Sequence, residues 1–107
     1  MNINWRGVYP AVTTKFNTDL TVDIEGFQNN ISAQIDAGVS GIILGGTLGE
    51  ASVLNGHEKS KLIEAAKETV NNKVPVIINI AEQTTEAAIA AAKTAENDGA
   101  NGLMMLP

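Results

Sequence analysis

The sequence contains no cysteine and only one histidine, His57. Without cysteine, the chain cannot form a disulfide, a thiolate metal site or a cysteine nucleophile. A single histidine with Glu58 as its acidic neighbour does not supply the set of ligands that a protein zinc site needs. We therefore expect neither a metal nor another cofactor in this chain.

Basic side chains and long apolar runs are also scarce. Seven Lys and Arg residues stand against twelve Asp and Glu residues, and the net charge is −5. No cluster of basic residues is present to neutralise nucleic-acid phosphates. No apolar run has the length of a transmembrane helix, and the first residues lack the basic and apolar regions of a secretory signal. We expect a cytoplasmic protein that binds neither nucleic acid nor a membrane.

The length sets a limit on the fold. The chain has 107 residues, of which 44% are hydrophobic and 18% are charged, a globular composition. No linker or low-complexity tract divides it, so we treat residues 1–107 as one unit. A complete (β/α)8 barrel needs about 250 residues. The chain is therefore too short for a whole barrel, and the apolar run at its end predicts a chain cut at a fourth strand.

Short apolar runs alternate with longer amphipathic ones, which is typical of β-α units around a parallel sheet. The pattern predicts four strands and three helices. We expect the strands over residues 7–12, 41–44, 74–80 and 102–106, and the helices over residues 23–37, from 55 to about 70, and from 84 or 85 to a stop at 99. The strands are apolar throughout, as expected where both faces of a sheet are covered.

Each predicted helix carries an apolar stripe at helical spacing. The expected buried residues are Ile24, Phe27, Ile31 and Ile35 in the first helix, Leu62, Ile63, Ala66 and Val70 in the second, and Ile89, Ala92 and Ala95 in the third. Asn55 and Glu58 stand at capping-box spacing. In two places a helix ends at a glycine and a strand starts at a second glycine, and these pairs are Gly38 with Gly41 and Gly99 with Gly102. We expect the same geometry at both.

The most informative segment follows the strand at residues 41–44. It is a glycine-rich loop with one hydroxyl and one carboxylate, and it reads Gly45-Gly46-Thr47-Leu48-Gly49-Glu50. Ligands of parallel α/β folds bind at the carboxyl ends of the strands. Glycines let main-chain N–H groups approach a small anion closely, and Thr47 adds a hydroxyl. The loop is therefore a predicted site for a carboxylate or phosphate, with Glu50 holding the loop's shape.

Several segments, taken in order, resemble the dihydrodipicolinate synthase and N-acetylneuraminate lyase superfamily. They are GVYPAVTT at residues 7–14, GVSGII at 38–43, GTLGE at 46–50, Leu54 with HEK at 57–59, VPVI at 74–77 and GANG at 99–102, continuing to Pro107. The resemblance covers nearly the whole chain. The glycine loop with its Gly-Glu ending is its most specific part.

This resemblance implies an α/β fold, the parallel (β/α)8 TIM barrel, of which the chain covers about the first half. It implies a lyase or aldolase, homo-oligomeric as a whole, that forms a Schiff base between a lysine and pyruvate or another 2-keto acid without a metal. Gly46, Thr47 and Leu48 would bind the carboxylate, and Gly49 and Glu50 would support the loop. The family's lysine and its principal tyrosine would both lie beyond Pro107, so we expect no catalytic residue in this chain and no activity from it alone.

One departure leaves the reaction open. Leu48 stands where dihydrodipicolinate synthases and neuraminate lyases commonly carry a second hydroxyl residue, so aldolases and dehydratases of keto-deoxy sugar acids fit equally well. A Schiff-base lysine must be desolvated. Lys15 follows the first predicted strand, and the other lysines fall on polar helix faces or ends, so we expect no covalent role for any of them. The remaining interpretations are a small carboxylate- or phosphate-binding module and a self-associating half-barrel.

Other conspicuous residues have structural explanations. Tyr9 is expected to fill the barrel or to lie at a strand end rather than to relay protons. Met104 and Met105 are expected in the strand core. His57 is expected in the exposed first turn of a helix. These residues therefore point to no further site.

Overall fold

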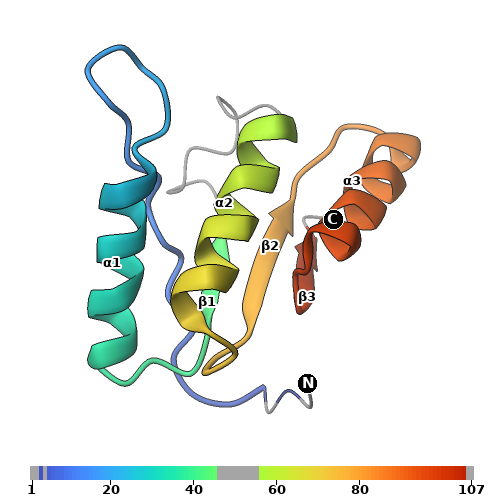
Figure 1. Cartoon of the computed structure of the whole chain (residues 1–107). Helices are drawn as coiled ribbons and strands as arrows, with labels where there is room; N and C mark the ends of the chain where they lie inside the picture. Colours follow the sequence, from blue (N-terminus) through green and yellow to red (C-terminus); the bar gives the residue numbers. More distant parts are fainter. Residues whose placement is uncertain (1–2, 4, 46–55, 106–107) are drawn as a thin grey trace.

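The computed structural model describes residues 3, 5–45 and 56–105, which form three parallel strands and three helices (Figure 1). In chain order the elements are α1 (Ile24–Asp36), β1 (Ile42–Leu44), α2 (Gly56–Val70), β2 (Val76–Ile80), α3 (Thr85–Asp98) and β3 (Gly102–Met105). The strands make one parallel sheet in the order β1-β2-β3. The predicted parallel α/β arrangement is confirmed.

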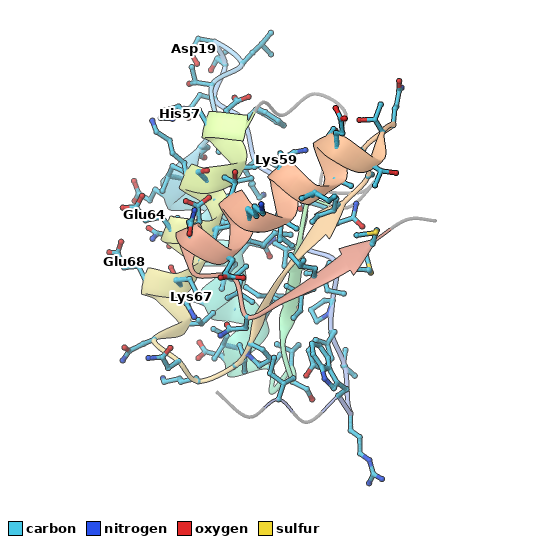
Figure 2. All side chains as sticks on the ribbon, turned by 90° about the vertical axis from the view of Figure 1, so that its right-hand side faces the viewer. Asp19, His57, Lys59, Glu64, Lys67 and Glu68 are labelled. Atoms are coloured by element: carbon cyan, nitrogen blue, oxygen red, sulfur yellow. The ribbon has the colours of Figure 1, made fainter. Side chains whose placement is uncertain are left out.

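The helices lie on one side of the sheet, and the core fills the space between the two layers (Figures 1 and 2). The largest fully buried side chains are Phe27 and Ile31 of α1, Leu62, Ile63 and Val70 of α2, and Ile42, Leu44 and Val76 of the sheet. The stripes predicted for α1 and α2 are confirmed, because their residues are either buried or packed against this core. Burial of such side chains stabilises the fold by about 1.5–3 kcal/mol each.

The helix ends follow from local sequence. The Asp23 carboxylate caps α1 by accepting a hydrogen bond from the Gly26 N–H at 3.0 Å, and the Thr84 hydroxyl caps α3 by accepting one from the Ala87 N–H at 3.0 Å. Gly38 and Gly99 follow α1 and α3 with φ of +91° and +96°, a conformation that favours glycine. The predicted repetition of this turn is confirmed. Asn55, the predicted cap of α2, lies outside the described residues.

The first predicted strand, residues 7–12, is not a regular strand. It is an extended segment joined to β1 by one parallel bridge between Ala11 and Ile43. The Pro10 carbonyl accepts from the Ile43 N–H, and the Val12 N–H donates to the Ile43 carbonyl, both at 2.9 Å. Pro10 has no N–H to donate and Gly7 has a φ of +98°, so the segment cannot sustain a regular ladder.

The prediction that every strand is covered on both faces is wrong for β3. β2 is buried throughout, but Leu103, Met104 and Met105 expose 44%, 40% and 58% of their surface. Met104 and Met105 are therefore not core residues here. β3 is the edge strand of the described sheet, so only β2 pairs with it. Ile89 of α3, predicted to be buried, is likewise 52% exposed.

Two aromatic rings cover the amino ends of β1 and β3. Trp5 and Tyr9 stack with ring centroids 6.0 Å apart. A Cβ atom at Gly41 would overlap the Tyr9 ring, and one at Gly102 would lie 2.9 Å from Cη2 of Trp5. Because Gly41 precedes β1 and Gly102 begins β3, Tyr9 has the predicted strand-end position.

The turn between the first segment and α1 is held by Asp19. Its Oδ1 accepts from the Thr21 hydroxyl at 2.6 Å and from the Thr21 N–H at 3.1 Å. These two hydrogen bonds hold the pKa of the exposed Asp19 carboxyl below its ordinary value. Figure 2 places Asp19 at the end of the molecule toward which the strands point.

Candidate functional site

The predicted ligand loop can be located by the described residues on its two sides. Gly46, Thr47, Leu48, Gly49 and Glu50 themselves lie outside the described residues. Gly45 follows β1 directly and has a φ of +69°, a left-handed conformation that glycine adopts without strain. On the other side Gly56 is the first residue of α2. The loop therefore starts at the carboxyl end of β1, where parallel α/β folds place their ligands.

The carboxyl ends of β1 and β2 lie together at this edge. Leu44 pairs with Ile78 in the parallel register. One residue further along, the side-chain Nδ2 of Asn79 donates a hydrogen bond to the Gly45 carbonyl at 3.2 Å. The amide of Asn79 thus fixes the last described residue before the predicted ligand loop to the neighbouring strand.

Asn79 is the functional candidate that the sequence analysis missed. It is 5% exposed, and among the described residues its Oδ1 has no hydrogen-bond partner. Buried polar atoms without partners are rare in folded proteins. A signal existed, because Asn79 is the single polar residue in the apolar strand Val76–Ile80 and stands next to its carboxyl end.

No lysine has the buried position that Schiff-base chemistry requires. All lysines of the chain lie in the described residues, and each is exposed or half-buried. Lys15 is exposed on the loop after the first segment. Lys59 lies 4.0 Å from the Glu82 carboxylate, and Lys67 donates to the Asn101 side chain at 3.1 Å. None of these amines is desolvated by burial, so the chain's own lysines are poor candidates for the nucleophile.

A groove of about 200 Å³ separates α2 from α3 and reaches the end of β2. Its polar residues are Lys59, Ser60, Asn79, Glu82, Thr94 and Asp98. The Ser60 hydroxyl donates to the Asp98 carboxylate at 2.6 Å, and the nearby Lys59 and Glu82 form an ion pair. The first pair joins α2 to α3, and the second joins α2 to the segment between β2 and α3. His57 is exposed in the first turn of α2, as predicted.

Among residues 3, 5–45 and 56–105, no group of three or more His, Cys, Asp or Glu side chains could hold a metal ion. No helix among them is long and apolar enough to cross a membrane.

Comparison with known proteins gives a consistent result. Residues 4–107 match the model of the dihydrodipicolinate synthetase family. The 4-hydroxy-tetrahydrodipicolinate synthase of Methanococcus aeolicus is 40% identical over 101 residues, which are 94% of this chain and 35% of that protein. The enzyme of the same name from Salinibacter ruber is 35% identical over 95% of this chain and 34% of its own length. The chain thus spans about a third of the length of these relatives.

Solved structures agree with the sequence relatives. Dihydrodipicolinate synthase DapA-2 from Bacillus anthracis superposes with a TM-score of 0.94 at 28% identity, over 99% of this chain and 36% of its own. YagE, a prophage protein of the dihydrodipicolinic acid synthase family from E. coli K12 solved with pyruvate, gives 0.87 at 31% identity, over 94% and 34%. The structural neighbours are TIM-barrel proteins, and the chain matches their amino-terminal part. The chain belongs to the dihydrodipicolinate synthetase family.

Proposed function

We propose that residues 1–107 are the amino-terminal part of a (β/α)8 barrel lyase that forms a Schiff base with pyruvate or another 2-keto acid. Gly46, Thr47 and Leu48 would bind the acid's carboxylate, with Gly49 and Glu50 supporting the loop. The observation that carries this proposal is the family match over residues 4–107 together with the position of Gly45 at the carboxyl end of β1. The pyruvate bound to the related YagE protein favours the same ligand class.

The chemistry divides between this chain and the rest of the barrel. The loop's N–H groups and the Thr47 hydroxyl would hold the carboxylate and so deliver the ketone to an amine, which condenses with it and releases water. No described lysine is buried, so the amine would come from outside this chain. The chain alone would then bind a keto acid without reacting. We further propose a cytoplasmic, homo-oligomeric parent protein that needs no cofactor.

The test uses the isotopically labelled 107-residue chain and pyruvate. We expect pyruvate to shift the backbone amide signals of residues 46–48 and the Thr47→Val substitution to weaken its binding about five- to tenfold, the effect of one lost hydrogen bond. Thr94→Val, at an exposed residue of α3, serves as the matched control and should leave binding unchanged. Borohydride reduction with pyruvate should leave the mass at 11.2 kDa. Unshifted loop amides, or a pyruvate adduct on any lysine, would contradict the proposal.

A second candidate function is self-association of the half-barrel. Its support is the apolar surface of β3, where Leu103, Met104 and Met105 are exposed at the edge of the described sheet. Edge strands with apolar side chains pair readily with other chains. This function requires no ligand and is tested by the oligomeric state of the chain.

A further inference from the structure

We propose that Asn79 contacts the substrate and selects 2-keto acids that carry a hydroxyl group on the carbon chain. This inference rests on the proposed function, because it assumes that a keto acid binds at the carboxyl ends of the strands. It is carried by the buried Oδ1 of Asn79, which has no partner among the described residues. It names a property of the substrate that the family match leaves open.

The orientation of the Asn79 amide is fixed by its neighbour. Nδ2 donates to the Gly45 carbonyl at 3.2 Å. If the amide were rotated by half a turn, two oxygens would face each other and this hydrogen bond would be lost. Oδ1 therefore points away from Gly45, and it can only accept a hydrogen bond.

The position of Asn79 in β2 determines the face of the sheet on which its side chain lies. Val76 and Ile78 belong to the core between the sheet and the helices. Side chains alternate along a strand, so Ile77 and Asn79 point to the opposite face. In a closed barrel that face is the interior. Asn79 is also next to the carboxyl end of β2, so its free acceptor lies at the ligand-binding end of the interior.

Asn101 is an asparagine with a structural role and can be compared with Asn79. Its Oδ1 accepts from the Val76 N–H at 2.9 Å and from Lys67 Nζ at 3.1 Å. Both donors come from the chain itself, and through them the side-chain oxygen links the residue before β3 to α2 and β2. Asn79 differs because no described residue donates a hydrogen bond to its side-chain oxygen. A buried acceptor of this kind matches a ligand that brings its own donor.

The chemistry of the ligand follows from this requirement. The carboxylate and ketone of a 2-keto acid can only accept hydrogen bonds, so they cannot satisfy Oδ1. A hydroxyl group further along the carbon chain can donate to it. A site that is built to bind a hydroxyl rejects the analogue without one, because its own polar group is then left unpaired. Asn79 would thus favour a hydroxylated keto acid over a plain one.

The experiment compares two acids with the same number of carbons, 2-keto-3-deoxygluconate with hydroxyls and 2-ketohexanoate without. Dissociation constants are measured by NMR titration on the labelled 107-residue chain. We expect the hydroxylated acid to bind about tenfold more tightly, and Asn79→Leu to remove this preference. Ser60→Ala, which breaks a hydrogen bond in the groove between the helices, is the matched control and should retain the preference. In the unsubstituted chain, the Asn79 side-chain amide signals should shift with the hydroxylated acid only, a readout that needs no variant.

The outcomes separate this inference from the proposed function. If both acids bind equally and shift residues 46–48, the keto-acid function stands and the role of Asn79 is overturned. If the Asn79→Leu chain keeps the preference, or if it weakens both acids by the same factor, the amide only positions Gly45 and the inference is wrong. If neither acid binds, the proposed function is wrong, and the inference that rests on it is wrong as well.

Discussion

Gly38 and Gly41 lie three residues apart and are needed for different reasons. Gly38 has a φ of +91° but open space around it, so a side chain there would meet only backbone strain. At Gly41 a Cβ atom would overlap the Tyr9 ring. Gly38 is required by the backbone conformation of the turn. Gly41 is required because the Tyr9 ring, from a distant part of the sequence, packs against it.

These two causes can be separated by substitution. We expect Gly38→Ala to lower the free energy of unfolding by about 1–2 kcal/mol through strain, and Gly41→Ala to lower it by about 1–3 kcal/mol through overpacking. In a Tyr9→Ala background the cost of Gly41→Ala should nearly disappear, and the cost of Gly38→Ala should persist. Urea unfolding of the single and double variants measures both couplings. Equal costs of Gly41→Ala in the two backgrounds would exclude the ring contact as the cause.

At the scale of single residues, the sequence predicts a ligand site in the glycine loop, which stays a prediction, and marks Asn79 only as a lone polar residue in an apolar strand. The glycine loop is a candidate because its composition is unusual by itself. The role of Asn79 depends on the hydrogen bond from its Nδ2 to the Gly45 carbonyl. The two residues are 34 positions apart in the chain, and the two atoms are 3.2 Å apart. Nothing local in the sequence states that such a pair will meet.

At the scale of elements, the helices are determined mainly by local signals. The buried stripes of α1 and α2 and the glycines that follow α1 and α3 were all predictable from spacing. The exception is α3, in which Ala95 is buried while Ile89 remains exposed. Helical spacing predicts a face, but whether that face is covered depends on what packs against it.

The cap of α3 provides a test at this scale. The Thr84 hydroxyl accepts from the Ala87 N–H, so Thr84→Ala should lower the free energy of unfolding by about 1 kcal/mol. Thr84→Ser keeps the acceptor, and because serine is at least as good an N-cap as threonine it should not lower the free energy of unfolding. Thr85→Ala, one residue later and already inside the helix, is the matched control, and it should be neutral or slightly stabilising. Thermal or urea unfolding decides, and equal losses at positions 84 and 85 would contradict the capping role.

At the scale of the whole molecule, the two edges of the described sheet differ. β1 is bordered by residues 7–12 and the Trp5–Tyr9 pair covers the amino ends, whereas β3 exposes Leu103, Met104 and Met105. In Figure 1 the 17–22 turn and β3 lie on opposite sides of the molecule. The exposed edge at β3 is where two copies of this chain could meet.

We therefore expect the chain to associate as its concentration rises, with β3 at the interface. Met105→Lys puts a charge on the exposed face of β3 and should shift the association to at least about tenfold higher concentration, because a buried unpaired charge is costly. Leu20→Lys, at a leucine that is 79% exposed on the 17–22 turn, is the matched control and should have no effect. Sedimentation velocity over a concentration series measures this. A native chain that stays monomeric throughout would rule out the self-association function.

The sequence by itself determined the α/β class, the three helices with their ends, the positions of β1 and β2, and the family, because periodicity, capping residues and glycine spacing act over a few neighbouring residues. Only the tertiary structure decided the rest. Residues 7–12 became a bridged segment instead of a strand, β3 proved exposed, and the Asn79 amide met Gly45. These outcomes depend on contacts between residues that are far apart in the sequence. Such contacts leave no pattern among neighbouring residues from which they could be predicted.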